Sequence, residues 1–508
     1  MPYFQFLFFK QYKSSKFASN FFQSKIMIHN STFEDQIKSY KLNQNACVKL
    51  IQIISDLWFN QSIELVLFRN QLIDRRVSFI LNLHQETKEY AGVELNIMET
   101  LKVAEAIYAL DLNPSRLDIG KLALNIRKQG IQEADIKEFV RKELEPANQH
   151  LPFQPKDVVL YGFGRIGRLL ARELISKAGA GRQLRLRAIV TRDEVNEKTL
   201  EKRASLLRQD SIHGNFDGEV AVDAENGALI INGIPVYIIS AKNPEDIDYG
   251  KYGIQDALVI DNTGAFRDDK ELSRHLTSKG ASMVLLTAPG KGVPNIVYGV
   301  NELDADTKKD QLFSAASCTT NAISPVLAVL ERELGINKGH IETIHSYTND
   351  QNLVDNMHKK SRRGRAAALN MVITETGAGS AVAKVLPALA GKLTSNAIRV
   401  PVPNGSMAIL NLELNNKTTL TELNDLLKKA ALDGDLVEQI SYTNNSELVS
   451  SDIIGTSAAS VIDAPANIVS EDGKAAIIYV WYDNEYGYSH QVMRLARHIA
   501  GVRRYTYY

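Results

Sequence analysis

Cys318 is the strongest candidate for a nucleophile in this chain. It lies in the segment Ser314–Pro325, where small hydroxyl residues flank it, and the apolar stretch from Val326 predicts a helix just beyond it. A thiol at a helix N-terminus faces the positive end of the helix dipole, which favours the thiolate. The backbone N–H groups there could also hold an oxyanion. A free cysteine is as often a small buried side chain, so position alone leaves both interpretations open.

His345 is a candidate base for this thiol. It lies at the end of a predicted strand that runs through Ile341, close enough in sequence to reach Cys318. An imidazole there could lower the thiol pKa and shuttle the substrate proton. A single histidine at a strand end is also commonly structural, so the pairing needs further support.

Positive and hydroxyl side chains downstream suit an anionic substrate. Arginines occur at Arg362, Arg363, Arg365 and Arg399, and the segment Thr374–Gly377 offers hydroxyls and backbone N–H groups. A phosphate-bearing substrate requires such groups. Each basic cluster alone also fits a solvated face or a subunit contact. Nucleic-acid binding is disfavoured, because Lys+Arg and Asp+Glu are both 59 and no aromatic residues interleave the cluster.

The elements that would position these residues begin at residue 156. An apolar run, Val158–Tyr161, enters the turn Gly162-Phe-Gly-Arg-Ile-Gly167, and an apolar helix follows it through Leu174. The glycines at 162, 164 and 167 allow a tight turn and a close approach to a pyrophosphate on the helix N-terminus. This order of strand, G-x-G-x-x-G turn and helix predicts a dinucleotide-binding unit.

Further short strands alternate with helices after this unit. Strands are predicted at Leu184–Val190, Ala257–Asp261 and Met283–Thr287, with a helical stretch over Asp268–Ser278. Such alternation is typical of a doubly wound parallel sheet.

Residues 34–144 predict an all-α region of no assignable function. Apolar residues from Leu50 to Trp58 recur at helical spacing, and Asn113-Pro114 ends a later helix. A further helix is predicted over Ile136–Leu144, and Pro146–Pro155 reads as a linker. No metal-ligand spacing, nucleophile motif or glycine loop occurs here. Residues 1–26 form either a leader or a mis-assigned start before Met27, and are expected to be disordered.

Bulk composition bounds the class of protein. A chain of 508 residues predicts two or three domains. Only Cys47 and Cys318 are present, so a disulfide framework is disfavoured and a reducing, cytoplasmic location is expected. No apolar run approaches the roughly 20 residues that span a bilayer, so no membrane association is predicted.

Six motifs, in the same order along the chain, resemble those of phosphorylating glyceraldehyde-3-phosphate dehydrogenases. They are Tyr161-Gly-Phe-Gly-Arg-Ile-Gly-Arg168, Asp210-Ser-Ile-His-Gly214, Ser317-Cys-Thr-Thr-Asn321, Arg362-Arg-Gly-Arg-Ala-Ala367, the run from Gly391 to Asn404, and Trp481-Tyr-Asp-Asn-Glu-Tyr-Gly-Tyr-Ser489. The resemblance covers about residues 155–501.

This resemblance implies a fold and a domain division. The fold is α/β: a Rossmann-type doubly wound parallel sheet, an α+β catalytic domain with a mainly antiparallel sheet, and the all-α N-terminal extension. The expected divisions are 1–26, the helical region 27–150, the NAD(P)-binding domain 151–317, the catalytic domain 318–480, and 481–508 as a C-terminal helix returning to the Rossmann domain.

The resemblance also implies a mechanism. Cys318 would add to the aldehyde of glyceraldehyde 3-phosphate, and His345 would take the proton as hydride passes to nicotinamide. Inorganic phosphate would then cleave the thioester. The residues implied around one anion are Ser317, Thr319, Thr376 and Gly377, and around the other Thr348 and Arg399. The residues implied to bind the cofactor are Gly162, Gly164, Arg165, Ile166, Gly167, Thr287 and Asn484.

Departures from the family pattern leave the choice between NAD and NADP open. The family commonly has Asn-Asp at the end of the second strand, where this chain has Thr191-Arg192. Either Asp193 takes over binding of the ribose hydroxyls, or Arg192 accommodates a 2′-phosphate. Lys242 stands where an adenosine-side arginine is usual.

The expected function is therefore reversible oxidation of glyceraldehyde 3-phosphate with NAD or NADP and inorganic phosphate, in glycolysis or gluconeogenesis. The resemblance suggests a homotetramer. No metal and no nucleic-acid partner is expected. Two alternatives stand beside this: an erythrose-4-phosphate dehydrogenase, and a non-catalytic scaffold that binds a partner through the helical region.

Overall fold

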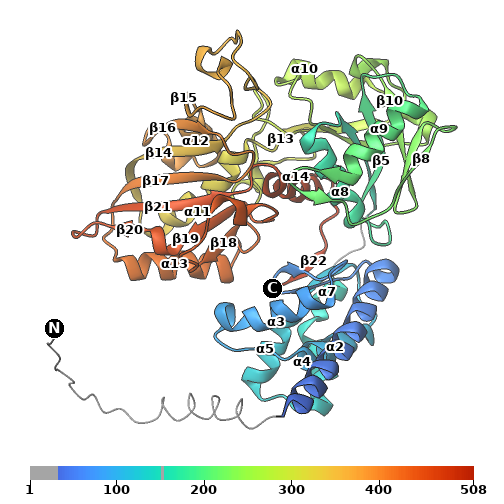
Figure 1. Cartoon of the computed structure of the whole chain (residues 1–508), viewed down its shortest axis with the longest axis vertical. Coiled ribbons are helices and arrows are strands. Elements are labelled where there is room, and N and C mark those ends of the chain that lie inside the picture. The colour runs from blue at the N-terminus through green and yellow to red at the C-terminus, as the bar shows by residue number, and fades with distance from the viewer. Residues whose placement is uncertain (1–31, 150–153) are drawn as a thin grey trace, which may run out of the picture. The chain divides into compact units, whose positions relative to one another are not determined.

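A computed structural model of the chain describes residues 32–149 and 154–508, and Figure 1 gives their trace. The segment expected to be a leader or mis-assigned start, 1–26, lies outside these residues, as does Met27. The described residues form two compact units. The smaller takes the chain up to Asp56 with Leu65–Asp111 and Asp118–Glu143, and the larger takes Leu57–Glu64, Leu112–Leu117 and the chain from Leu144. Among the described helices, none is long and apolar enough to cross a membrane.

The smaller unit is mainly helical, as expected. Its helices are α2 (Phe33–Asp56), α3 (Val77–Ala91), α4 (Ile97–Tyr108), α5 (Ile119–Gln129) and α6 (Ile136–Glu143). Apolar residues at helical spacing bury one face of each main helix, for example Leu50 and Ile54 of α2. Side-chain caps begin two of the helices: Asn96 accepts from Met98 N, and Asp118 accepts from Gly120 N and Lys121 N.

Two details of the prediction for this region are corrected. It is not all-α, because strands β1 (Glu64–Leu67), β2 (Asn70–Gln71) and β3 (Ser115–Asp118) interrupt the helices. Strands of two to four residues are too short to leave a period in the sequence. The expected linker from Pro146 also begins later, since α7 (Glu145–Gln149) is helical. Pro146 sits in the first turn of α7, where its missing N–H costs no hydrogen bond.

An eight-stranded sheet confirms the doubly wound prediction. Its order is β13-β12-β11-β4-β5-β10-β9-β8, and β13 through β10 run parallel. The parallel strands are β4 (Lys156–Tyr161), β5 (Leu184–Thr191), β10 (Ile234–Ser240), β11 (Ala257–Asp261), β12 (Ala281–Leu286) and β13 (Leu312–Ser314); β8 (Val220–Asp223) and β9 (Ala228–Ile231) form the antiparallel edge. The chain order reverses on the two sides of β4. In such sheets ligands bind beyond the carboxyl ends of the strands at this switch point.

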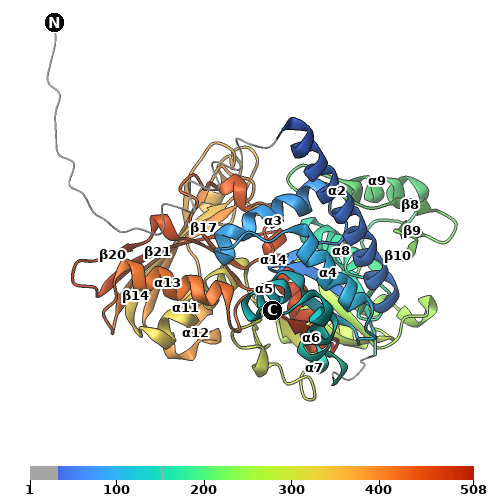
Figure 2. The same cartoon turned by 90° about the horizontal axis from the view of Figure 1, so that it is seen from below.

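A second, mainly antiparallel sheet has the order β15-β16-β14-β17-β21-β19-β18. Its strands are β14 (Ile336–Ser346), β15 (Val372–Thr374), β16 (Leu393–Val400), β17 (Ser406–Leu414), β18 (Ile440–Thr443), β19 (Ser460–Asp463) and β21 (Ala475–Tyr482), with β20 (Ile468–Val469) paired to β21. Helices α11 (Cys318–Glu333), α12 (Ala378–Val385) and α13 (Leu420–Leu432) cover one face of this sheet, as Figure 2 shows.

The last helix, α14 (Tyr486–Ile499), joins the core of the parallel sheet. Val492, Leu495 and Ala496 are buried in one cluster with Leu170 and Leu174 of α8 (Arg165–Ser176). The chain ends in strand β22 (Tyr505–Tyr507), which pairs in parallel with β3.

A buried ionic cluster forms next to this C-terminal strand, within the larger unit. The carboxylate of Glu64 is 2% exposed and contacts Lys177, Arg116 and Arg504. These three positive charges hold the pKa of Glu64 well below its ordinary value, although burial acts in the opposite direction. The cluster therefore joins four segments that are far apart in sequence.

Candidate active site

Cys318 is the first residue of α11, directly after its N-cap. Ser317 is that N-cap, and its Oγ accepts a hydrogen bond of 3.0 Å from Thr320 N. The preceding residue, Ala316, has a left-handed φ of 54°, which costs free energy for a residue with a Cβ. Tyr488 compensates by donating its hydroxyl to Ala316 O at 2.9 Å.

The imidazole of His345 faces the thiol. Cys318 Sγ and His345 Nε2 are 3.6 Å apart. On the other side of the ring, Nδ1 lies 2.7 Å from Ser346 O. With its proton on Nδ1, the ring donates to this carbonyl and turns the Nε2 lone pair toward sulfur.

Arg399 is the third member of this group. It lies opposite His345 in the parallel register of β16 and β14. Its Nη1 lies 2.8 Å from His345 Nδ1 and donates to Ser346 O at 2.8 Å. The pairing of the two strands thus places the Arg399 guanidinium on the Nδ1 side of the imidazole, although Arg399 lies 53 residues beyond Ser346 in sequence.

Burial dominates the electrostatics of this group. It raises the pKa of the Cys318 thiol, while the charge of Arg399 acts in the opposite direction. Burial and, second, the charge of Arg399 lower the pKa of His345 to about 3. A neutral imidazole therefore faces a thiol at neutral pH. The charge of Arg399 does not outweigh burial, so the pKa of the Cys318 thiol stays above its ordinary value.

The other residues predicted to surround the two anions lie on neighbouring elements. Thr319 is buried, and its Oγ1 lies 3.0 Å from the hydroxyl of Tyr482. Thr376 Oγ1 accepts from Ala378 N at 3.2 Å, and Gly377 is the N-cap of α12, which packs against α11. Thr348 lies two residues beyond β14 and is half-buried.

The β4–α8 turn has the geometry of a pyrophosphate site. Gly162 has a φ of 107°, and a Cβ on Gly167 would lie 2.5 Å from the carbonyl oxygen of Gly162. Both positions therefore require glycine. Gly164 is the N-cap of α8 and supplies no side-chain cap, which leaves the first N–H groups of the helix available to an anion. Ile166 packs against the core of the sheet.

The guanidinium of Arg165, at the start of α8, pairs with two carboxylates. It binds Glu485 with contacts of 2.5 and 2.6 Å and Asp210 at 3.3 Å. His213 Nε2 lies 2.9 Å from the same Glu485 carboxylate. These contacts connect the β4–α8 turn to Glu485, the residue that follows Asn484. Glu485, Asp210 and His213 were missed as positioning residues, although the motifs that contain them are in the sequence.

Two predicted cofactor residues lie at the carboxyl ends of strands. Thr287 follows β12, and its Oγ1 donates to Asp261 O at 3.1 Å. Asn484 follows β21, and its Oδ1 accepts a hydrogen bond of 2.8 Å from Ser406 Oγ. Because the oxygen faces Ser406, the amide nitrogen faces away from it. Asn484 could thus donate to a carboxamide.

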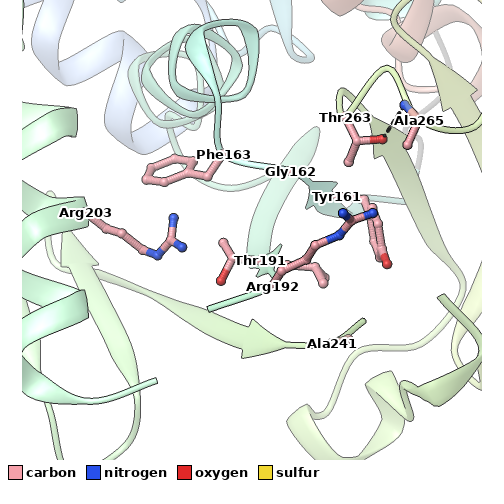
Figure 3. A pocket seen from close by; sticks show the side chains of 10 residues that line it. Tyr161, Gly162, Phe163, Thr191, Arg192, Arg203, Ala241, Thr263 and Ala265 are labelled. Carbon is pink, nitrogen blue, oxygen red and sulfur yellow. Dashed lines mark hydrogen bonds between the residues drawn. The ribbon is translucent and has the colours of Figure 1, made fainter. Parts of the chain in front are cut away.

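A pocket of about 290 Å³ opens beside the turn, at the end of β5. Figure 3 shows the residues that line it, among them Arg192, Thr191 and Arg203. Arg203 comes from α9 (Glu197–Arg208) and was missed, because no motif marks it. Asp193 does not line the pocket; its carboxylate contacts Arg203 instead. Lys242 is exposed and does not line the pocket either, although its neighbour Ala241 does.

A doubly wound sheet with an open glycine turn, in one chain with a thiol–imidazole pair, defines a nicotinamide-nucleotide-dependent oxidoreductase. A family profile described as "Glyceraldehyde 3-phosphate dehydrogenase, NAD binding domain" matches residues 156–269, and one described as "Glyceraldehyde 3-phosphate dehydrogenase, C-terminal domain" matches residues 317–484. A glyceraldehyde-3-phosphate dehydrogenase of Geobacillus stearothermophilus is 41% identical over 68% of this chain and 98% of its own length. The chain belongs to the glyceraldehyde-3-phosphate dehydrogenase family.

A second relative extends the likeness beyond the two family domains. The "Glyceraldehyde-3-phosphate dehydrogenase-like protein" of Pseudomonas aeruginosa is 49% identical over 89% of this chain and 98% of its own length. Residues 156–508 make up little more than two thirds of the chain, so this match must run into the helical region. By comparison, the match with glyceraldehyde-3-phosphate dehydrogenase 1 of Bacillus subtilis, which is 41% identical, covers only 68% of this chain.

Proposed function

We propose that this protein oxidises glyceraldehyde 3-phosphate reversibly to 1,3-bisphosphoglycerate, with reduction of NAD(P), through a thioester on Cys318. The observation that carries the proposal is the 3.6 Å approach of His345 Nε2 to Cys318 Sγ, in a member of this family. The neutral imidazole is in the protonation state that a general base needs.

The chain's own groups account for the proton and acyl steps. His345 takes the thiol proton as sulfur adds to the aldehyde carbon and passes it to the carbonyl oxygen, so a neutral hemithioacetal forms on Cys318 and the imidazole is neutral again. When bound, NAD(P) supplies the hydride acceptor. His345 removes the hydroxyl proton of the hemithioacetal as hydride leaves, which produces the thioester. Inorganic phosphate then attacks the acyl carbon, the carbon–sulfur bond breaks, and the sulfur regains a proton from His345.

Two anion positions are proposed around the thiol. Ser317, Thr319, Thr376 and Gly377 would bind one phosphate, and Thr348 and Arg399 the other. The hydroxyls of Thr319 and Thr376 and the guanidinium of Arg399 are suitable donors. Arg399 would then have two roles, because its Nη1 already donates to Ser346 O, the carbonyl that also accepts from His345 Nδ1.

The proposed cofactor site runs along the carboxyl ends of the parallel strands. The start of α8 would hold the pyrophosphate through Gly164, Arg165 and Ile166. Thr287 and Asn484 would lie at the nicotinamide end. The Arg165–Glu485 contact couples the two ends of this site.

A homotetramer is proposed for the assembly. The segment between β14 and β15 exposes a set of large apolar side chains: Leu353, Val354, Met357, Leu369 and Met371. Exposed apolar residues gathered on one segment are typical of a subunit contact. Size-exclusion chromatography with light scattering would measure the molar mass of the purified assembly and so test this proposal. A cytoplasmic location stays a prediction.

A Cys318→Ser variant tests the proposed function. NAD(P)-dependent oxidation of glyceraldehyde 3-phosphate should be lost, while the fold and dinucleotide binding are retained. Parallel assays with erythrose 4-phosphate, with and without inorganic phosphate, rank the two aldehydes. Faster turnover of erythrose 4-phosphate without phosphate would favour the alternative substrate.

A further inference from the structure

The pocket at the end of β5 has an unusual balance of charge. Of the ten residues that line it, two are arginines and none is acidic. Arg192 follows β5 directly and is exposed, whereas Arg203 reaches in from α9 with a side chain only 14% exposed. In Figure 3 both guanidinium groups lie over the pocket on either side of Thr191. Two guanidinium groups from separate elements thus border one small cavity.

Thr191 adds an unused hydrogen-bonding group. The residue is 8% exposed, and its Oγ1 has no hydrogen-bond partner among the residues that the structure describes. A buried hydroxyl without a partner is costly. Because Thr191 lines the pocket, a ligand in the pocket could satisfy this hydroxyl.

The carboxylate that could bind a ribose hydroxyl is engaged elsewhere. Asp193 contacts Arg203 and does not line the pocket. In dinucleotide folds, an acid at this strand end accepts from the ribose 2′-hydroxyl and would repel a 2′-phosphate. Here the acid is withdrawn from the pocket, and two guanidinium groups remain in its lining.

We propose that Arg192 and Arg203, with the Thr191 hydroxyl, bind the 2′-phosphate of NADP, and that the protein prefers NADP to NAD. Guanidinium groups bind phosphate through paired, charge-assisted hydrogen bonds. This inference rests on the proposed function only for the class of cofactor, a nicotinamide dinucleotide. It names Arg203 as a residue that determines cofactor specificity.

Direct binding to the full chain tests the proposal without turnover. Adenosine 2′,5′-bisphosphate and adenosine 5′-monophosphate differ only in the 2′-phosphate, and calorimetric titration gives a Kd for each. The bisphosphate should bind at least about 10-fold more tightly, because a hydrogen bond to a charged group is worth about one such factor. The advantage should shrink as ionic strength rises.

Two variants and a matched control locate the effect. Arg192→Ala and Arg203→Ala should each weaken bisphosphate binding about 10-fold and leave the monophosphate within about twofold. Lys202→Ala removes the same charge from the same helix at an exposed position that does not line the pocket, and should leave both Kd values unchanged. Arg203→Lys keeps the charge without the paired geometry and guards against loss of folding; its bisphosphate Kd should fall between those of the wild type and Arg203→Ala.

The role of Asp193 separates the two cofactors. Asp193→Asn removes the partner of Arg203, so the bisphosphate should bind more tightly. If Asp193 instead bound the ribose hydroxyls, the same change would weaken NAD binding, and the proposal would be wrong. Equal Kd values for the two adenosine phosphates, or equal losses for both in the arginine variants, would also overturn it. Failure of the proposed function is distinguishable, because an enzyme that binds the bisphosphate tightly but oxidises no aldehyde would refute only the proposed activity.

Discussion

His345 Nδ1 and Arg399 Nη1 lie 2.8 Å apart, as direct partners across the parallel strands β14 and β16. The register of two strands therefore sets the electrostatics of the proposed base. Burial lowers the pKa of His345 to about 3, and the charge of Arg399 adds to this effect. The same charge opposes the rise that burial causes in the pKa of Cys318. One guanidinium thus keeps the base neutral and eases deprotonation of the thiol.

The pH dependence of thiol alkylation should reflect this arrangement. Since the pKa of His345 is lowered to about 3 and that of Cys318 is raised, the rate of alkylation should climb steadily from neutral to alkaline pH. No step should occur near pH 6.5, where an ordinary histidine titrates. The rate of iodoacetamide labelling across the pH range measures this. A step near pH 6.5 followed by a plateau would contradict the neutral pair.

Removal of Arg399 should slow the same labelling reaction. Arg399→Gln deletes the charge that lowers the thiol pKa, so less thiolate forms at a given pH. The pKa of His345 should move back toward its ordinary value. Arg332→Gln, at an exposed position on α11, is the matched control and should label like the wild type. Unchanged labelling of the Arg399 variant would show that burial alone sets the thiol pKa.

His345→Asn should separate catalysis from binding. The variant loses the group that removes the substrate protons, so kcat should fall by about 10²–10⁴. Substrate contacts to the anion residues remain, so KM should change little. Steady-state rates of NAD(P)H formation give both constants. A fall confined to KM would assign His345 to substrate binding instead.

Much of the fold could be predicted, because regular elements leave periods and motifs in the sequence. Strand β11 was predicted at its observed bounds, Ala257–Asp261. A helix was predicted from the apolar stretch at Val326, and α11 contains that stretch but begins earlier, at Cys318. Strands β1 and β2 were missed, since four and two residues establish no period. Pro146 was taken as a linker start, although proline fits the first turn of a helix.

The candidate site was predicted in part, because some of its residues stand in sequence motifs and others do not. Cys318 and His345 stand in recognisable segments, and the structure brings them together. Arg203 could not be found, because it lines the same pocket as Arg192 only once α9 has packed against β8 and β9 of the sheet. The ionic cluster around Glu64 was also invisible, since its members lie up to 440 residues apart in sequence. Charged residues look alike in sequence whether they are buried or exposed.

Glu485→Gln should weaken dinucleotide binding without changing the chemistry. This carboxylate holds Arg165 at the cofactor turn and His213 beside it. Without the charge, the turn loses a contact worth about 1.5–3 kcal/mol between its ends, so the Kd for the dinucleotide should rise. Calorimetry measures that Kd, and labelling of Cys318 is the control that should not change. A fall in labelling with normal dinucleotide affinity would place Glu485 in the thiol site instead.

Glu64→Gln should destabilise the larger unit strongly. Loss of one charge from a buried cluster leaves Lys177 and Arg504 without the carboxylate that each contacts, which costs about 3–5 kcal/mol. Trp58 packs against Arg504 with its ring centre 5.1 Å away, so its fluorescence reports on the cluster during urea unfolding. Glu413→Gln removes an exposed carboxylate that pairs with Lys338 and is the control that should barely shift the midpoint. Equal midpoints for the two variants would argue that the cluster adds no stability.

Acid should destabilise the protein in two overlapping steps that involve His490 and Glu438. Burial lowers the pKa of His490 to about 4 in the folded protein. Below about pH 6.5 the imidazole is protonated in the unfolded chain but still neutral in the folded one, so the free energy of unfolding falls as the pH drops from 6.5 toward 4. The pKa of Glu438 is lowered to about 2, because Arg494 and Arg116 outweigh its burial. Its contribution is present above about pH 4.5 and is lost as pH falls through 2. Both effects have the same sign, so the Tm should decline below pH 6.5 and more steeply below pH 4.5. Glu438→Gln should lower the Tm at pH 7 and flatten the steeper part, and a variant with an unchanged slope below pH 4.5 would exclude Glu438 as its source.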